Sequence, residues 1–165
     1  MFLLTTFMYF ITRDGVFDEA PVTTWKRNRP QFVYWASGAN HWGGYAFRLC
    51  KITSSGISGV TEKCFQRGHL KFHGRYTWLY DRPTWRRFDS RKWMQKTARR
   101  RTRNTYPPGS MWTEVKPPRR SFWAFRDLVF VPGNLPCGEY ILSFRWDCQR
   151  TPQIWSSCSL IRIVE

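Results

Sequence analysis

The chain has 165 residues, a length that suits one domain whose hydrophobic core needs no metal ion to form. Trp, Tyr and Phe make up 18% of the chain, which argues against a disordered protein and favours a packed β architecture, a platform for a ligand, or both. Lys and Arg number 27 against 11 Asp and Glu. The resulting net charge of +16 favours polyanionic partners such as nucleic acid, acidic glycans or anionic membrane.

The first eleven residues, MFLLTTFMYFI, are apolar but lack the basic residues and the small-residue cleavage site of a signal peptide. The stretch is also too short to cross a bilayer, so we expect no membrane span. We assign residues 1–30 to an N-terminal segment of undefined status and residues 31–165 to a single domain.

Five later segments are typical of β-strands: residues 31–36, 44–50, 127–131, 139–147 and 158–164. In the segment 139–147, alternation predicts a half-buried strand with Tyr140, Leu142, Phe144 and Trp146 on its buried face. Stretches rich in Pro and Gly, such as YPPGS and VPGNLPCG, separate these segments and indicate turns. The pattern predicts an all-β fold, an antiparallel β-sandwich with long loops and less helix than strand.

Residues 82–126 concentrate the positive charge, with fourteen Lys or Arg and only two acids. Charge of one sign at this density is typical of a solvated loop, so we predict a basic insert that is the least ordered part of the domain. Its densest run contains the candidate polyanion-binding residues Arg99, Arg100, Arg101 and Arg103. We expect affinity for a polyanion there to fall steeply as salt rises.

The sequence contains no GxSxG, P-loop, GxGxxG or HExxH motif. Its three histidines are His41, His69 and His73. On a strand, His69 and His73 would lie roughly 13 Å apart, so we expect no metal ion between them. His41 precedes a Trp-Gly-Gly turn, and its own surroundings favour a hydrogen-bonded loop histidine over a metal ligand.

Five cysteines, at positions 50, 64, 137, 148 and 158, show neither CxxC spacing nor a compact Cys/His cluster typical of zinc sites. Two pairs at loop-forming distances with one cysteine left over would suit an oxidising compartment. From the residues alone, the pairing stays open.

Two long motifs carry a family resemblance: NHWGGYAFRLC at residues 40–50 and RWDCQRTPQIWSSC at residues 145–158. With GVTEKCFQRGHLKF and YPPGSMWT, they resemble a eukaryotic branch of the lytic polysaccharide monooxygenases, also called chitin-binding type-4 domains. The resemblance covers about residues 31–164. It implies a secreted, monomeric, immunoglobulin-like sandwich that oxidatively cleaves a chitin-like or cellulose-like polysaccharide.

The resemblance also implies one copper ion, held by a histidine brace formed from an N-terminal histidine and a second histidine. His41 falls at the second position, while Gln153 and Trp155 match the outer-shell glutamine and the ring below the metal. The sequence departs from the family's pattern: no histidine precedes His41, the segment upstream of that motif is short, and Trp42 replaces one of three glycines. The usual DCEQTP also stands as DCQRTP. We therefore expect weak copper binding, and an inactive enzyme unless an N-terminal histidine is supplied.

The resemblance assigns the cysteines as well. It implies disulfides Cys50–Cys64 and Cys148–Cys158, with Cys137 unpaired. Each bridge would contribute about 3 kcal/mol to stability in the loop-entropy model.

Three functions remain open. The first is a copper-dependent polysaccharide monooxygenase, and the second is a non-catalytic secreted carbohydrate-binding module that could also take anionic polymers through the basic insert. The third, less favoured, is a basic nucleic-acid-binding protein, suggested by the net charge of +16 and by interleaved Arg and Trp.

Overall fold

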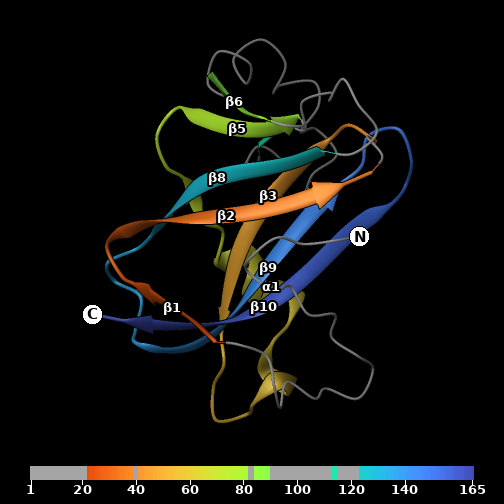
Figure 1. The fold of residues 1–165 in the computed structure, drawn as a ribbon. Coiled ribbons are helices and arrows are strands. Elements are labelled where there is room, and N and C mark those ends of the chain that lie inside the picture. Colours follow the sequence, from red (N-terminus) through yellow and green to blue (C-terminus); the bar gives the residue numbers. More distant parts are fainter. Residues whose placement is uncertain (1–21, 39–40, 82–83, 90–112, 115–122) are drawn as a thin grey trace.

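The structure is a computed structural model that describes residues 22–38, 41–81, 84–89, 113–114 and 123–165. Two sheets face each other (Figure 1). The first sheet has the order β1 (Thr23–Lys26), β10 (Ile154–Val164), β9 (Gly138–Asp147), β3 (Gly44–Lys51) and β7 (Thr113–Glu114). The second has the order β2 (Arg29–Ser37), β8 (Trp123–Val131), β5 (Tyr76–Asp81) and β6 (Thr84–Asp89), and β4 (Lys71–Phe72) also pairs with β8.

The all-β sandwich predicted from the alternation is confirmed. Each of the five predicted segments lies within an observed strand, and all pairings except β1 with β10 are antiparallel. Helical structure in the described residues consists of α1 (Glu62–Arg67) and the 3-10 turn Ile57–Gly59. No helix in this described part of the chain is long and apolar enough to cross a membrane.

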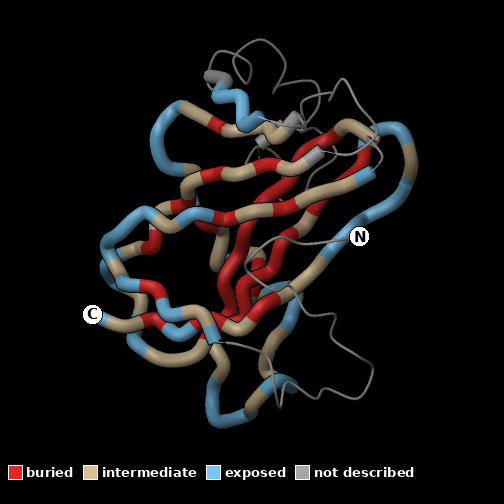
Figure 2. Tube along the Cα trace, viewed as in Figure 1, coloured by how far each residue is buried: buried red, intermediate tan, exposed pale blue. Residues whose placement is uncertain are grey.

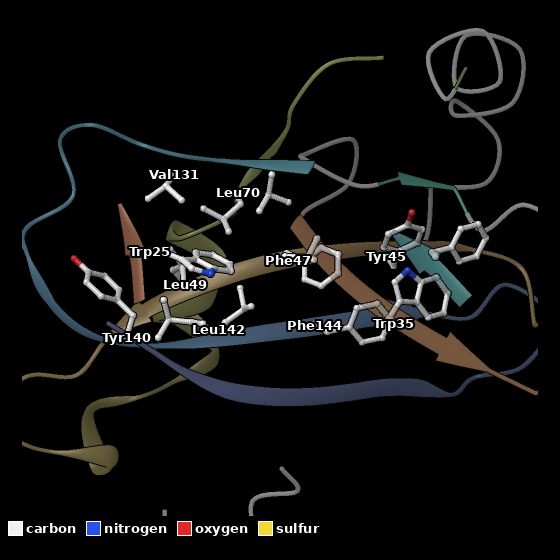
Figure 3. Packing of buried hydrophobic residues seen from close by; sticks show 14 of the residues in the cluster. Trp25, Trp35, Tyr45, Phe47, Leu49, Leu70, Val131, Tyr140, Leu142 and Phe144 are labelled. Atoms are coloured by element: carbon white, nitrogen blue, oxygen red, sulfur yellow. The ribbon is translucent and has the colours of Figure 1, made fainter. Parts of the chain in front are cut away.

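The sandwich includes residues before position 31, where the sequence placed the start of the domain. Strand β1 pairs in parallel with the end of β10, which places Trp25 beside Ile163. The Trp25 side chain is buried in the core (Figure 3). The predicted boundary at residue 31 is therefore too late.

The central strands β3 and β9 are buried on both faces, although the sequence predicted a half-buried strand for β9 (Figure 2). Their inner faces pack against the second sheet. On the outer face, Cys50 and Ile141 pack with Phe65 of α1 in a separate buried cluster. The helix and its flanking loop cover the face that would otherwise be in water.

Aromatic side chains fill one end of the core between the sheets (Figure 3). The Trp35 ring centroid lies 4.7 Å from Tyr45, 5.0 Å from Phe125 and 4.8 Å from Phe144. These contacts join β2 and β8 of one sheet to β3 and β9 of the other. Rings at such separations stabilise the packing beyond the area that they bury.

One of the two predicted disulfides forms. Cys50 and Cys64 are bonded and tie β3 to α1. The Cys148–Cys158 prediction is wrong, because both cysteines are free and Cys158 pairs in register with Ser143. Position 143 lies roughly 17 Å along the strand from position 148, and a disulfide requires Cα atoms about 4–7 Å apart. Cys137 is free and exposed.

Part of the predicted basic insert belongs to the sheets. Strands β6 and β7 and the first residues of β8 lie within residues 82–126 and pair with neighbouring strands. These residues are therefore strands of the sandwich and do not belong to a loop. The arginine run that includes Arg99 and Arg103 lies outside the described residues.

Candidate functional site

The segment that begins at His41 is held against the turn between β9 and β10. The backbone N–H groups of Gln149 and Arg150 both donate to the His41 carbonyl oxygen at 3.1 Å. The indole Nε1 of Trp146 donates to the Trp42 carbonyl oxygen at 2.7 Å. These three bonds anchor the backbone on which the His41 side chain stands.

The turn that follows His41 has an unusual backbone. Trp42 has a φ of 58° and Gly43 a φ of 95°, both in the left-handed region that favours glycine. A Cβ atom at position 43 would lie 1.9 Å from the carbonyl oxygen of Asp147, so that position requires glycine on two grounds. At position 42 a tryptophan takes up this strained conformation, and the Arg150 guanidinium carbon lies 4.8 Å from the centroid of its ring.

His41, Gln153 and Trp155 gather at one end of the sandwich, around Trp146. The imidazole centroid of His41 lies 5.9 Å from the Trp146 ring, and Trp155 is the register partner of Trp146 across β10 and β9. Gln153 closes the connecting turn, because its carbonyl accepts from the Cys148 N–H at 3.1 Å. The fold thus brings His41 near Gln153 and Trp155, which lie more than a hundred positions later in the sequence.

The two residues from the β10 side face solvent. Trp155 is 46% exposed and its neighbour Ile154 is also exposed. The side-chain oxygen of Gln153 accepts a hydrogen bond from the Thr151 hydroxyl at 3.0 Å. An exposed ring of this kind can contact a large ligand directly.

A pocket of about 420 Å³ adjoins this end of the molecule. Its lining comes from the end of β9, the turn and the start of β10: Arg145, Asp147, Cys148, Gln149, Arg150, Thr151, Pro152, Gln153 and Ile154. Within it, the Arg145 guanidinium donates to both carboxylate oxygens of Asp147, at 2.7 Å and 3.3 Å. The Arg145 and Asp147 charges at the edge of the pocket are therefore already paired with each other.

A charged network behind the pocket was not anticipated from the sequence. Arg48 is only 2% exposed and donates to Glu62 at 2.7 Å and to Ser143 at 3.0 Å. Arg145 donates to the same Glu62 oxygen at 2.6 Å. Burial and the positive charge of Arg48 lower the pKa of the nearby His69 to about 4.

His69 and His73 lie in an extended segment on either side of β4, as the sequence led us to expect. His69 forms an isolated bridge with Arg48, while the His73 ring stacks on Phe130 at 5.7 Å. No group of three or more His, Cys, Asp or Glu side chains that could hold a metal ion occurs among the described residues.

A second unanticipated group lies inside the core. Asp127 is 1% exposed and accepts hydrogen bonds from the Tyr45 hydroxyl at 2.7 Å and from the Thr77 hydroxyl at 2.6 Å. Burial raises the pKa of Asp127 to about 6, even though both hydrogen bonds favour its ionised form. The only sequence signal was an acid at the start of the apolar run DLVFV.

Comparisons with known proteins identify the fold. No protein-family model and no curated protein sequence matches the chain. Among solved structures, it resembles a lytic polysaccharide monooxygenase AA15 from Thermobia domestica in the Cu(I) state, with a TM-score of 0.56 and 14% sequence identity. The match covers 90% of this chain and 66% of that one. At this identity, the likeness shows a shared sandwich fold and nothing finer.

Proposed function

We propose that the chain acts on polysaccharide by copper-dependent oxidation, with His41 as a copper ligand. The observation that carries this proposal is the convergence of His41, Gln153 and Trp155 around Trp146, in a sandwich shared with a lytic polysaccharide monooxygenase. These residues belong to two separate sequence motifs, at residues 40–50 and 145–158. Their proximity is what a common site requires.

The described residues fit copper only in part. His41 offers one imidazole on an anchored backbone, and imidazole is a good copper ligand. No described cluster of His, Cys, Asp or Glu completes the set, so the remaining nitrogens have to come from outside the described residues. When bound, copper would supply the oxidising chemistry at a glycosidic C–H bond. Gln153 and Trp155 would border it and contact the polysaccharide.

A second candidate function is polysaccharide binding without oxidation. It is favoured by the single imidazole at this end and by the solvent-facing Trp155, which could pack against sugar rings without any metal. Chitin-like and cellulose-like chains are the proposed ligands in both cases. Secretion of a monomeric protein is part of the proposal, supported by the Cys50–Cys64 disulfide.

The arginine run at positions 99–103 is a proposed auxiliary site for anionic polymers. It contains Arg99, Arg100, Arg101 and Arg103. Neutralising these four side chains should weaken polyanion binding and flatten its salt dependence. Retention of heparin affinity at high salt after that change would contradict the electrostatic assignment.

Copper binding tests the main proposal. Titration calorimetry and electron paramagnetic resonance would compare the unmodified protein with a variant extended at its N-terminus so that histidine is the first residue. We expect loose binding in the former and binding tighter by orders of magnitude in the latter, because chelation by several nitrogens raises affinity. His41→Ala should abolish the gain, and His73→Ala, a matched change away from Trp146, should retain it.

Activity separates the two candidates. The extended, copper-loaded protein should release oxidised oligosaccharides from chitin or cellulose in the presence of a reductant, as detected by mass spectrometry. Binding to the same polysaccharides without oxidised products would establish the second candidate instead. If His41→Ala left copper affinity unchanged, His41 would be an ordinary loop histidine and the copper assignment would fail.

A further inference from the structure

Strands β2, β8, β5 and β6 form one sheet (Figure 1). The outward face of this sheet carries a row of alternating aromatic and guanidinium groups. Tyr34 pairs with Arg126, and Arg126 pairs with Trp78. Trp78 in turn pairs with Arg87 on β6. Because residues paired across neighbouring strands point to the same side, the four side chains form one line across the sheet. The chain neighbours of Tyr34 and Arg126 are buried in the core, so this line lies on the outside.

Further rings extend the row into a surface. Phe32 lies 5.8 Å from Trp78, and Trp85 lies 5.2 Å from Tyr80 and 6.4 Å from Tyr34. Phe32 is 43% exposed and Trp85 is 38% exposed. We call this surface the aromatic–arginine face and define it by Phe32, Tyr34, Trp78, Tyr80, Trp85, Arg87 and Arg126. The rings of Tyr34, Trp78 and Tyr80 are half-buried between them. An apolar patch that reaches the surface in this way often marks an interaction site.

The arginines of this face are held by rings. The Arg126 guanidinium carbon lies 5.0 Å from the Phe32 ring, 4.8 Å from Trp78 and 5.1 Å from Trp85. That of Arg87 lies 4.2 Å from the Tyr76 ring. Cation–π contacts restrict these side chains without neutralising them. No ion pair between described residues involves Arg87 or Arg126.

We propose that the aromatic–arginine face binds an anionic polysaccharide, such as a sulfated or carboxylated glycan, at a site separate from the His41 end. The ring faces would pack against the C–H faces of the sugars, and the guanidinium forks would take sulfate or carboxylate groups through paired hydrogen bonds. A neutral glycan would leave the arginines unused, and a simple polyphosphate would leave the rings unused. The row spans four strands, roughly 14 Å, enough for several sugar units to lie across it.

Single-stranded nucleic acid is the competing ligand, since bases also stack on rings and phosphates also pair with arginine. Two observations favour the glycan. The Cys50–Cys64 disulfide is typical of proteins outside the cytosol, where acidic glycans occur. The fold is shared with a protein named for acting on polysaccharide, and in this respect the inference rests on the proposed function.

The test measures affinity for heparin, chondroitin sulfate, colloidal chitin and an oligothymidylate at about 0.15 M salt. Arg87→Gln combined with Arg126→Gln should weaken heparin binding about tenfold or more, because two charges that would bind sulfate groups are lost. Trp85→Ala should weaken it by a similar factor, roughly tenfold, through lost stacking. The matched control, Arg67→Gln with Arg162→Gln, removes two exposed charges elsewhere on the molecule. It should lower the affinity for heparin less than about threefold.

Each outcome decides the matter. Equal losses of heparin affinity in the control pair and in the face pair would show that only net charge matters. Heparin binding insensitive to Trp85→Ala would show that the rings take no part. Either result overturns the proposal. Tighter binding of oligothymidylate than of heparin, with the same variant sensitivities, would assign the face to nucleic acid. Arg87→Gln alone serves if the double variant fails to fold. Unchanged heparin binding in folded face variants, alongside His41-dependent copper binding, would refute this inference and leave the proposed function standing.

Discussion

Replacing Asp127 with asparagine should remove one pH-dependent contribution to the free energy of unfolding. The carboxyl group of Asp127 is enclosed between the two sheets, and burial raises its pKa to about 6 against about 3.9 in an unfolded chain. Between these two pKa values the folded protein holds a proton that the unfolded chain has released. Stability from this group therefore falls as pH rises from about 4 to about 6, by roughly 3 kcal/mol in total.

The variant keeps the shape of the side chain but removes the titration. An asparagine amide can accept from one of the hydroxyls of Tyr45 and Thr77 and donate to the other, with imperfect geometry that costs about 1 kcal/mol. Asp127→Asn should thus be about 1 kcal/mol less stable than wild type near pH 4. Near pH 7.5, ionised Asp127 lowers the stability of the wild type by the roughly 3 kcal/mol given above. The variant avoids this loss and should there be more stable than wild type by roughly 2 kcal/mol.

His69 makes the comparison between variant and wild type necessary. Burial lowers the pKa of His69 to about 4, so its contribution to stability is lost as pH falls from about 6.5 to about 4. This trend opposes that of Asp127 in nearly the same range, and the two should leave the wild-type curve almost level. Subtracting the two curves isolates position 127, because His69 is unchanged in both.

The assay is urea unfolding followed by tryptophan fluorescence at a series of pH values, with equal slopes confirming comparable transitions. Glu139→Gln, an amide substitution on the surface beside Arg162, controls for the chemical change itself. A stability difference between Asp127→Asn and wild type that did not change with pH would refute the reasoning. So would a variant less stable than wild type at neutral pH.

Three further predictions concern structural links near the candidate site. Removing the disulfide with Cys50→Ser and Cys64→Ser should lower the free energy of unfolding by about 3 kcal/mol, measured by denaturant titration; a loss below about 1 kcal/mol would contradict the loop-entropy account. Gly43→Ala should lower the free energy of unfolding by at least about 2 kcal/mol, because the backbone is left-handed and a Cβ atom would collide with the Asp147 carbonyl oxygen. An unchanged melting temperature would show that the turn relaxes easily. Glu62→Gln should cost about 1–2 kcal/mol at neutral pH by leaving the buried guanidinium of Arg48 without an anion, and the cost should vanish at a pH low enough to protonate Glu62.

The strands could be predicted from the sequence because a strand's alternation is local. The residues from Glu139 to Asp147 specify a face by side-chain type alone, and any sheet that buries this face satisfies them. The sequence also placed His41 and Gln153 in two motifs, and the structure brought both to one end of the sandwich. A sequence motif and the alternation of side chains along a strand both depend on residues that are close in the chain, so the sequence is enough to recognise them.

Contacts between distant segments were decided only by the tertiary structure. Cys148 and Cys158 are close in sequence, yet the hairpin register sets them far apart along β9 and β10, which spacing alone could not show. The burial of Asp127 and the aromatic environment of Arg126 depend on which strands become neighbours. A side chain's dielectric surroundings and partners arise from packing between sheets, and the linear order of residues does not contain that information.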